Sequence, residues 1–558
     1  MPTGTAAQKS KSRATVLCLL GIFVLGLFLR VYGIGWGLPN KGCFVSYKSD
    51  ENIYIRSISQ MDPSRLDFNP RFFYWGSWHF YELALALKVA QAFHFIHVSP
   101  DKHFYYVHPE ETARIYLVGR MLSVVFGIAA ILLVYLLGTK MDQSPVALTA
   151  AFLLAVMPAH AVNSHFLKAD AALTFWVTTV LFFSIKILSE GKLRYYFLSG
   201  ATLGIASATQ NYGALFAGSI LAAHFLRESQ KVSLQIRWKL LFSKKLSLAG
   251  FAAIGAFLAA TPYVILDFKA FFSPVVDRLS WGLAVTTADE RRSIIADTLG
   301  LLSVGMTWPL LGWLAAALLS ALLGRRKNEW VILSWLLPWF CYMIASGLLA
   351  TRFQMVIWPG AALLIASFIC RVWGSVNLRK FTFVKVCALV LFIFSSLFSI
   401  GYAFAYDRML GREPRQDVAG RWLIENVPLG ATIGIPTRAF VERVPTVVHQ
   451  DFFYQKSPEL WKCRYKVFNI EYDVTKLREA NPEYFVTSVR DGFGKYEGLA
   501  QDEPFPLTKE LLDRYEVLKV FEEKTRLFGL EFKTSKAMLS DWHGPLYPLY
   551  ILKRRGEG

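Results

Sequence analysis

The chain has few charged residues and few cysteines for its length. Charged residues make up 18% of its 558 positions, whereas hydrophobic residues make up 54%. With a mean hydropathy of +0.36, this composition excludes an ordinary soluble enzyme and is typical of a protein that crosses a membrane several times. The six cysteines have no regular spacing, so no disulfide framework is expected. Cys43 and Cys463 are both expected outside the membrane, where pairing and separate thiols remain open alternatives.

Acidic residues are also scarce, with 41 Asp and Glu against 60 Lys and Arg. From Tyr406 onward the two signs nearly balance, at 24 basic against 23 acidic residues, so the excess of 36 over 18 lies in the first 405 positions. A nucleic-acid-binding protein would need a basic soluble face. An excess confined to the apolar part fits the positive-inside bias of membrane proteins. We therefore expect no nucleic-acid partner.

Long apolar segments predict an α-helical multispanning membrane protein. Several approach the ~20 residues that a helix needs to cross a bilayer. About eleven spans are expected, at residues 15–34, 115–138, 146–163, 171–189, 197–209, 212–226, 246–265, 299–323, 330–349, 354–373 and 382–405. The stretch from Phe197 to Leu226 also allows a single long tilted helix, because its only interruption is the polar sequence A-T-Q-N-Y-G.

Basic loops indicate the orientation. They occur at residues 9–13, 227–245, 325–327 and 371–380. With eleven spans all of them fall on the cytoplasmic side, which places the N-terminus inside and the region after Tyr406 outside. The first span, which has no small-residue cleavage site after it, is interpreted as a retained anchor. We expect an integral protein of the bacterial cytoplasmic membrane.

Two domains follow from this pattern. Residues 1–405 form the transmembrane domain, which includes an external loop at 35–114, and residues 406–558 form an external soluble α/β domain. In the latter, R-Q-D-V-A-G-R-W-L-I-E-N-V predicts an amphipathic helix and A-T-I-G-I a strand. In the loop, the aromatic-rich stretch that begins N-P-R-F-F-Y-W predicts a helix lying at the membrane interface, with a twelfth span as the alternative.

Several motifs recur in a fixed order along the chain. They are D-E-N-I-Y from Asp50, N-P-R-F-F-Y-W, A-R-I-Y-L-V-G-R-M-L-S, F-L-K-A-D-A-A-L-T-F, T-P-Y-V-I-L-D-F-K-A-F and T-R-F-Q-M-V-I-W-P. This ordered set resembles the C-type (GT-C) glycosyltransferases that depend on a polyprenyl-phosphate sugar, the group of protein O-mannosyltransferases and lipid A aminoarabinose transferases. The chain departs from the family pattern at Thr209-Gln210, where many relatives have Thr-Lys, and at Trp358-Pro359, which retains only part of a P-x-x-P sequence.

The resemblance implies transfer of a sugar from a polyprenyl-phosphate donor in the membrane lipid to an acceptor hydroxyl, on the external face. Asp50 matches the catalytic carboxylate of the first loop. A carboxylate in hydrogen-bond reach of an acceptor hydroxyl can take its proton, a contribution of about 10² to 10⁴ in rate. Direct attack would invert the anomeric centre. The adjacent Glu51 is expected to orient the base.

Further candidates contact substrate in this hypothesis: Asp170, Lys168, His165, Arg352, Arg120 and Tyr54. Cations would stabilise the phosphate that leaves with the lipid. No cofactor is obligatory, although Asp50 and Asp170 could hold Mg²⁺ or Mn²⁺. Each candidate has a structural alternative. Cations at span ends commonly anchor a helix at the interface, and Arg120, inside a span, could pair with Glu110, Glu111 or another loop carboxylate.

The competing functional class is a transporter or flippase of a lipid-linked sugar, and a non-catalytic lipid-binding protein is third. A transporter is expected to place polar sites near mid-membrane on broken helices, often in repeated halves. The candidates here gather at outer span ends and in external loops, and the sequence shows no repeat. The sequence therefore favours chemistry at the external interface.

The topology can be tested directly. A tag placed after Gly558 should be labelled by a membrane-impermeant reagent without permeabilising the cytoplasmic membrane, because eleven spans that start inside must end outside. A tag between Ser229 and Lys239 is the matched cytoplasmic control. Labelling of the Gly558 tag only after permeabilisation would contradict the predicted topology.

Overall fold

The computed structural model describes residues 6–141, 144–229, 239–283, 288–346, 350–375, 382–457, 459, 461–488, 506–532 and 547–556. The chain forms two compact units. Unit 1 comprises Met1–Val31, Ser57–Leu85 and Met121–Phe404, and unit 2 comprises Tyr32–Arg56, Ala86–Arg120 and Ala405–Gly558. The basic residues Lys231, Arg237, Arg379 and Lys380, used above to orient the chain, lie outside the described residues.

Unit 1 is helical. Three of its helices, α3, α5 and α18, continue into the residue ranges of unit 2. The elements are α1 (Ala6–Val31), η1 (Pro63–Arg65), α3 (Trp78–Ala92), α5 (Pro109–Met141), α6 (Ser144–Val156), α7 (Pro158–Asn163), α8 (Ala169–Glu190), α9 (Leu193–Thr209), η2 (Asn211–Phe216), α10 (Ala217–Glu228), α11 (Lys244–Ala260), α12 (Tyr263–Leu266), α13 (Phe268–Leu283), α14 (Ala288–Gly305), α15 (Trp308–Gly324), α16 (Lys327–Ser346), η5 (Thr351–Ile357), α17 (Trp358–Ser375) and α18 (Thr382–Leu410).

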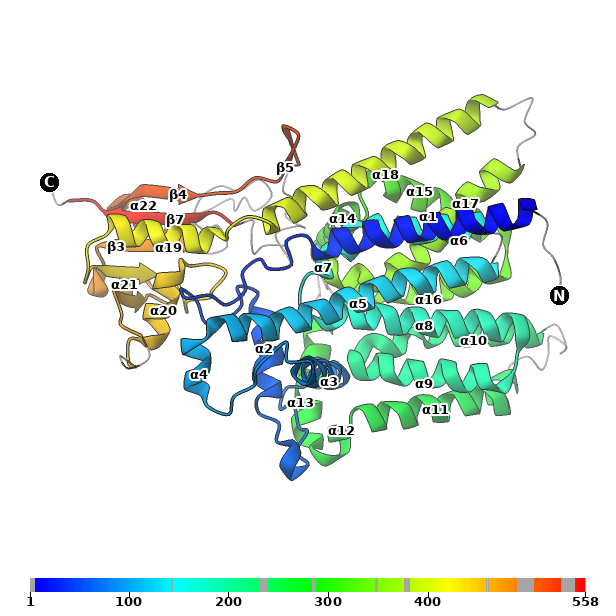
Figure 1. Ribbon diagram of the computed structural model, residues 1–558, viewed down its shortest axis with the longest axis horizontal. Helices are drawn as coiled ribbons and strands as arrows, with labels where there is room; N and C mark the ends of the chain where they lie inside the picture. Colours follow the sequence, from blue (N-terminus) through cyan, green and yellow to red (C-terminus); the bar gives the residue numbers. More distant parts are fainter. Residues whose placement is uncertain are drawn as a thin grey trace. The chain divides into compact units, whose positions relative to one another are not determined.

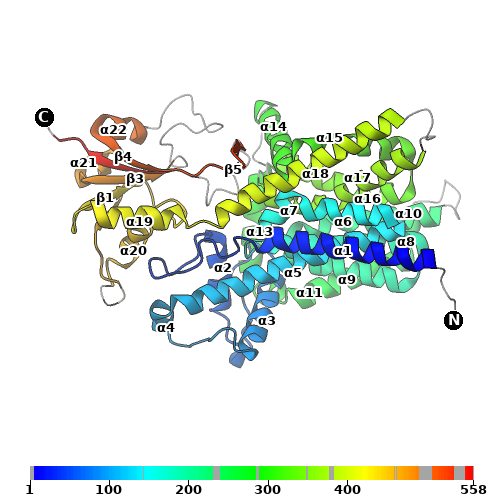
Figure 2. The same ribbon diagram turned by 45° about the horizontal axis from the view of Figure 1, so that its top comes forward.

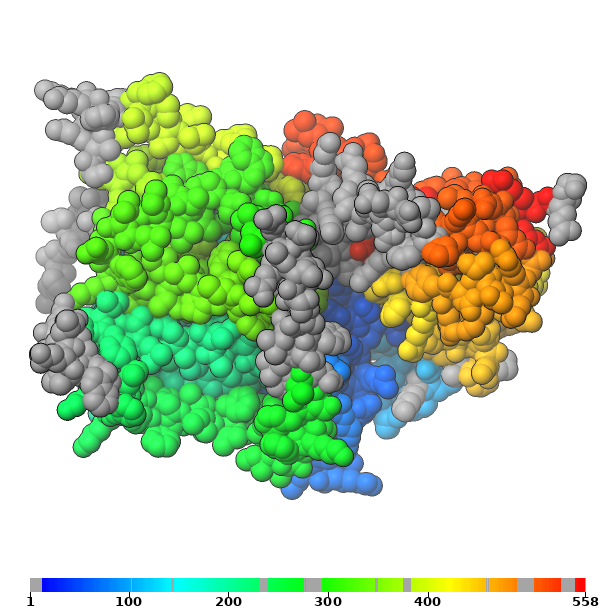
Figure 3. All heavy atoms as spheres, turned by 180° about the vertical axis from the view of Figure 1, so that it is seen from behind, coloured from blue at the N-terminus to red at the C-terminus, as the bar shows by residue number. Residues whose placement is uncertain are grey.

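Helices α8 to α11 lie side by side, with α9 between α8 and α11 (Figures 1 and 2). Two glycines explain how close α9 and α11 come. A side chain at Gly200 would meet the carbonyl oxygen of Ala249, and one at Gly204 that of Ala253. Small residues four positions apart let two helix backbones approach closely, which strengthens van der Waals packing where lipid supplies no hydrophobic driving force. From behind, the green side chains of α9 to α17 pack tightly over this face of unit 1 (Figure 3).

The polar interruption after α9 separates two helices. Gln210 has an extended backbone (φ −150°, ψ 135°) that ends α9, and α10 begins after the short η2. Both α9 and α10 pack against α8. The prediction of two short helices is therefore confirmed, and the alternative of one long tilted helix is wrong.

The predicted span at 299–323 is wrong as a single helix. The structure has α14 and α15 there, at an angle of 110° to each other. Thr307, between them, has a φ of +72°, and Pro309 in the first turn of α15 has no N–H to continue a helix from Gly305. The prediction failed because hydropathy measures how long an apolar segment is, but it does not reveal where the backbone changes direction.

Among the described residues, six helices are long and apolar enough to cross a membrane, or up to seven if the bent pair α14 and α15 counts as one span. The predicted interfacial helix is α3. His79, Phe80 and Leu83 are buried, whereas Leu85 and Val89 are exposed. The helix is therefore present, and its position at the membrane interface stays a prediction.

Unit 2 contains a five-stranded mixed sheet in the order β2-β1-β3-β7-β4. β1, β2 and β3 are parallel, and β7 is antiparallel to both β3 and β4. The helix and the strand predicted in this part of the sequence are present as α19 and β1. The elements of the unit are α2 (Ser49–Ile58), α4 (Lys102–Val107), α19 (Arg415–Asn426), β1 (Thr432–Ile435), α20 (Thr446–Tyr454), β2 (Lys466–Asn469), α21 (Val474–Ala480), β3 (Tyr484–Ser488), α22 (Pro506–Arg514), β4 (Tyr515–Phe521), β5 (Arg526–Leu527), β6 (Leu530–Glu531) and β7 (Leu549–Arg554).

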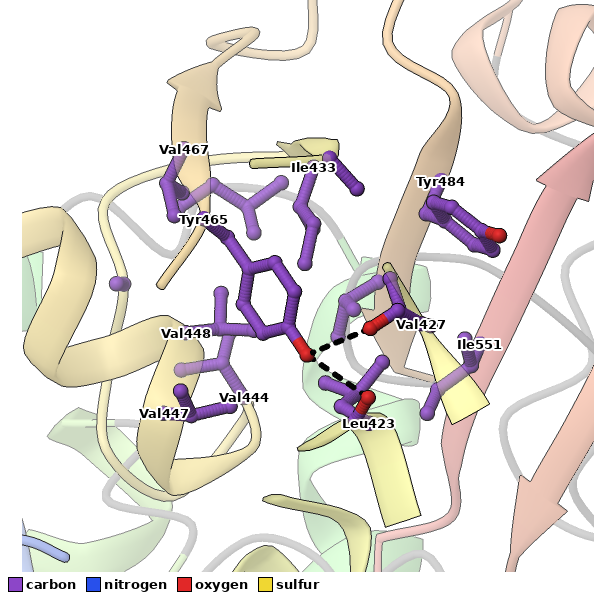
Figure 4. Close-up of a cluster of buried hydrophobic side chains, with 14 residues drawn as sticks. Leu423, Val427, Ile433, Val444, Val447, Val448, Tyr465, Val467, Tyr484 and Ile551 are labelled. Atoms are coloured by element: carbon purple, nitrogen blue, oxygen red, sulfur yellow. Dashed lines mark hydrogen bonds between the residues drawn. The ribbon is translucent and has the colours of Figure 1, made fainter. Parts of the chain in front are cut away.

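The sheet has a hydrophobic core on each face because successive strand residues point to opposite sides. Val486 and Ile551 pack with α19 and α20, whereas their neighbours Phe485 and Leu552 pack with α21 and α22. The first core contains the buried Tyr465, whose hydroxyl donates to the carbonyl oxygens of Leu423 and Val427 (Figure 4). Helices thus cover both faces of the sheet (Figure 2).

The two cysteines considered for a disulfide are separate thiols. The Cys43 thiol donates to the carbonyl of Val45, and the Cys463 thiol to the carbonyl of Asp451. The structure therefore has no bridge between them.

His449 of α20 makes the stability of unit 2 depend on pH. Burial lowers its pKa from 6.5 to about 4. Between pH 6.5 and pH 4, this histidine is protonated in the unfolded chain but neutral in the folded protein. The free energy of unfolding therefore falls as pH decreases, by about 1.4 kcal/mol per pH unit and about 3 kcal/mol in all. Above pH 6.5 this contribution is fully present.

His449→Gln should therefore reduce the drop in unfolding temperature of the full chain in detergent between pH 7 and pH 4.5. His103→Gln, at an exposed histidine, is the control and should leave the drop unchanged. An identical drop in wild type and His449→Gln would show that His449 does not set this pH dependence.

Candidate functional site

Glu51 and Arg120 form a buried ion pair in unit 2. Arg120 Nε and Nη2 donate to the two carboxylate oxygens of Glu51 at 2.9 and 2.8 Å, and both side chains have no exposed surface. Arg120 Nη1 donates to the carbonyl oxygens of Ile34 and Trp36 at 2.6 and 2.7 Å, and Ser46 Oγ also donates to Glu51. The guanidinium thereby ties the start of the first loop to α2 and α5.

This pair answers the question that the sequence left open for Arg120. The ion-pair alternative holds, and the partner is Glu51, since Glu111 pairs with Arg114 and Glu110 with His108. The structure places Glu51 against a cation that donates to both of its carboxylate oxygens. Glu51 can thus fix the first turn of α2, in which Asp50 lies.

Asp50 is part-buried and lies in the first turn of α2. The turn is held by Asn52. Its side chain accepts from the Ser46 N–H and donates to the Ser46 carbonyl, both at 3.1 Å, and it also accepts from the Tyr116 hydroxyl at 2.7 Å. Tyr54, the remaining candidate in this segment, is buried one turn later. Carboxylates at a helix N-terminus are stabilised by the helix dipole, the structural alternative for Asp50.

Two acidic residues that the sequence analysis missed also contact this segment. Asp417 of α19 accepts hydrogen bonds from the Tyr47 hydroxyl and from Asn40 Nδ2, the latter at 3.2 Å. Glu442 Oε1 accepts from Ser49 Oγ at 3.1 Å. Burial raises the pKa of the Asp417 carboxyl. No local sequence signal marks these residues, because each is one acidic residue in a polar stretch some 370 to 390 positions from its partner.

Three candidates meet in unit 1, where α7 leads into α8. His165, Lys168 and Asp170 are all buried there. Asp170 Oδ1 accepts from Gln210 Nε2 at 3.4 Å, so the residue that stands where many relatives have Lys contacts the candidate carboxylate. The His165 ring bonds the Ala161 carbonyl at 3.1 Å, and the separate His160 accepts from Arg30 at 2.6 Å. The two histidines therefore have different partners.

Arg352 lies in η5, which packs against α7 and α8. Its guanidinium stands over the Phe353 ring at 4.9 Å. The ring belongs to an aromatic group built with Tyr212 and Trp339, and Trp339 Nε1 donates to the Phe353 carbonyl at 3.0 Å. The segment of Arg352 thus packs against the two helices that flank His165 and Lys168, and the second of these helices carries Asp170.

The motif N-P-R-F-F-Y-W contacts the motif T-P-Y-V-I-L-D-F. Asn69 Nδ2 donates to Asp267 at 3.0 Å, and the rings of Phe73 and Phe271 lie 5.6 Å apart. Gly76, which follows the first motif, is required by space, since a Cβ there would lie 2.0 Å from the Ala208 carbonyl oxygen. This second part of the first loop is therefore fixed against unit 1 beside the end of α9.

Among the described residues, no group of three or more His, Cys, Asp or Glu side chains could hold a metal ion. Asp50 and Asp170, the two carboxylates considered for Mg²⁺ or Mn²⁺, belong to different units. A metal role for them stays a prediction.

Residues 116–257 match the family described as dolichyl-phosphate-mannose-protein mannosyltransferase. The resemblance inferred from the motifs is thereby confirmed for this part of the chain. No curated protein sequence matches the chain.

The chain is similar to three kinds of solved structure. ArnT from Cupriavidus metallidurans bound to undecaprenyl phosphate is 12% identical, with 96% of this chain and 97% of that chain covered and a TM-score of 0.49. The oligosaccharyltransferase AglB from Archaeoglobus fulgidus, in complex with an inhibitory peptide and a dolichol-phosphate, is 14% identical, with 86% and 70% covered and a TM-score of 0.48. The S. cerevisiae protein O-mannosyltransferase Pmt1-Pmt2 complex bound to the sugar donor is 17% identical, with 46% and 34% covered and a TM-score of 0.33.

The Glu51–Arg120 pair yields a prediction of stability. Arg120→Met should destabilise the protein by about 3–5 kcal/mol, because it leaves a buried carboxylate without its cation. Adding Glu51→Gln to this variant should recover part of the loss in unfolding temperature. Arg114→Met, on the same helix but half exposed, is the control and should cost little. Equal effects at the two arginines would contradict the buried pair.

Proposed function

We propose that the protein is an integral membrane glycosyltransferase that transfers a sugar from a polyprenyl-phosphate carrier to an acceptor hydroxyl on the external face. The observation that carries the proposal is the placement of Asp50, a part-buried carboxylate whose next residue is locked in a buried ion pair. The family matched at residues 116–257 supports it, since that family is named for a dolichyl-phosphate sugar donor.

Asp50 is the proposed general base. The acceptor hydroxyl gives its proton to the Asp50 carboxylate while its oxygen attacks the anomeric carbon, and the bond from that carbon to the carrier phosphate breaks. One displacement of this kind inverts the anomeric configuration. Glu51 acts on Asp50 through the backbone of α2, because its own oxygens are engaged by Arg120.

The carrier phosphate is assigned to the cations of unit 1. Arg352 can offer a planar set of N–H donors to phosphate oxygens, and its stacking on Phe353 presets the guanidinium plane. Lys168 supplies a second positive charge at the start of α8. These charges would stabilise the leaving phosphate, so the reaction needs no general acid. Asp170, held by Gln210, is the proposed partner of a sugar hydroxyl.

Several finer features belong to the same proposal. Eleven spans, a cytoplasmic N-terminus and an external α/β region after Tyr406 place Asp50 on the external side. A count of eleven is reached when the bent pair α14 and α15 is one span, which makes seven long apolar spans among the described residues, and when the four shorter helices α6, α9, α10 and α11 also cross. The bacterial cytoplasmic membrane is the proposed location.

A transporter or flippase of a lipid-linked sugar is the second candidate. The bend of 110° between α14 and α15 favours it, since broken helices line the substrate sites of many transporters. The two candidates differ in product. A transferase forms a new glycosidic bond and releases the free carrier phosphate, whereas a flippase leaves the lipid-linked sugar intact.

Asp50→Asn tests the proposal because it keeps the size of the side chain and removes its basicity. Membranes that carry the protein should add a sugar of defined mass to a cell-surface lipid, glycan or protein, detected by mass spectrometry, and Asp50→Asn should slow this by at least ~10². Undecaprenyl phosphate should raise the unfolding temperature of wild type and of the variant equally.

Asp101→Asn is the matched control. Asp101 lies in the same external loop and caps α4, a position that asparagine also fills well. This variant should transfer at the wild-type rate. A wild-type rate for purified Asp50→Asn would exclude Asp50 as the base, and an unchanged set of surface masses with and without the protein would exclude the transferase function.

A further inference from the structure

Asp50 is the residue between two anchored neighbours. Glu51, which follows it, is fixed by Arg120, and Ser49, which precedes it, is hydrogen-bonded to Glu442. Two positions further back, Tyr47 is fixed by Asp417. The first anchor comes from α5, whereas the other two come from α19 and from the segment that leads into α20.

The two acidic anchors are themselves connected. Gln416, next to Asp417 on α19, donates from Nε2 to the Glu442 carbonyl at 3.2 Å, and Thr446 Oγ1 donates to the Gln416 carbonyl at 3.4 Å. Glu442 is 4% exposed, and Gln416 is fully buried. Asp417 and Glu442 therefore move as one body with the start of α19 and α20.

Asp417 and Glu442 contact the segment between Gly37 and Ser49, which leads into α2. Gly37, with a φ of +62°, lies against the Tyr47 ring, and its carbonyl accepts from the Tyr47 N–H at 2.8 Å. Residues 37–48 belong to no helix and to no strand of the sheet. A few backbone hydrogen bonds and the side-chain hydrogen bonds of Tyr47 and Ser49 hold this segment, so Asp417 and Glu442 act on the residues that lead directly to Asp50.

We propose that Asp417 and Glu442 are positioning residues, which hold Tyr47 and Ser49 so that the Asp50 carboxylate points at the acceptor hydroxyl. The inference rests on the proposed function, because it assigns the orientation of the base in that reaction. The α/β region after Tyr406 then contributes directly to the rate of transfer. Misplacement of a reacting group by about 1 Å can cost about a hundredfold.

Clean deletions of single hydroxyls test the inference. Ser49→Ala and Tyr47→Phe should each lower the rate of sugar transfer about tenfold or more at saturating donor. The donor is the polyprenyl-phosphate lipid fraction extracted from the source cells, and the amount that gives half-maximal rate should stay within about twofold of wild type. Glu442→Leu should lower the rate of transfer as much as Ser49→Ala does. The double variant should be no slower than either single variant. Glu442→Gln should keep the wild-type rate, because its amide oxygen can still accept the hydrogen bond from Ser49.

The same changes in the Asp50→Asn protein separate positioning from folding. If Ser49 and Tyr47 act through Asp50, their deletion should cause no further loss when the base is already absent. Tyr465→Phe is the matched control, since it removes a buried hydroxyl from the same region that bonds only to carbonyls within the core (Figure 4). It should lower the unfolding temperature and leave the rate per folded molecule unchanged.

Two results would overturn the inference while the proposed function stands: wild-type rates for both Ser49→Ala and Glu442→Leu, or the same proportional loss in the wild-type and Asp50→Asn backgrounds. A different result would overturn the proposed function itself. Wild-type protein that forms no product from the lipid fraction, or that is equalled by Asp50→Asn, would remove both.

Discussion

The buried ion pair of Glu51 and Arg120 is the constraint on which the candidate site depends. A guanidinium without exposed surface is costly unless all its donors have partners, and here they are met by a carboxylate, a hydroxyl and two backbone carbonyls. Because these acceptors come from the first loop and from α2, the arginine of α5 dictates how the chain leaves the first helix. The first turn of α2, where Asp50 lies, is held in place by these contacts.

Asp50 and Glu51 are adjacent carboxylates, but the structure gives them different environments. Both residues are carboxylates, but one is sealed against a cation and the other remains partly accessible. A carboxylate bound on both oxygens by a guanidinium fixes structure, whereas a partly accessible one can accept a proton from a substrate. The environment of each residue thus separates the anchor from the candidate base, although they are adjacent in sequence.

In unit 1, glycines allow neighbouring segments to pack with their backbones in close contact. Gly200 and Gly204 admit α11 against α9, and Gly76 admits the first loop against the end of α9. With lipid in place of water, helices gain little from burying apolar surface and much from tight packing and satisfied polar groups. The segment of Gln210, at the end of α9, is consequently held in place next to Asp170.

The sequence by itself determined the apolar helices, the break after α9, and a helix and a strand of the region after Tyr406, because these depend on composition and local periodicity. Asp50 was proposed from the resemblance of its motif to a known family. It could not separate α14 from α15, since hydropathy does not see a positive φ at Thr307. Only the tertiary structure decided that Glu51 is the partner of Arg120 and that Asp417 and Glu442 hold Tyr47 and Ser49. Hydrogen bonds between residues 69 to 393 positions apart leave no periodic trace in a single sequence, because they depend on how distant segments pack.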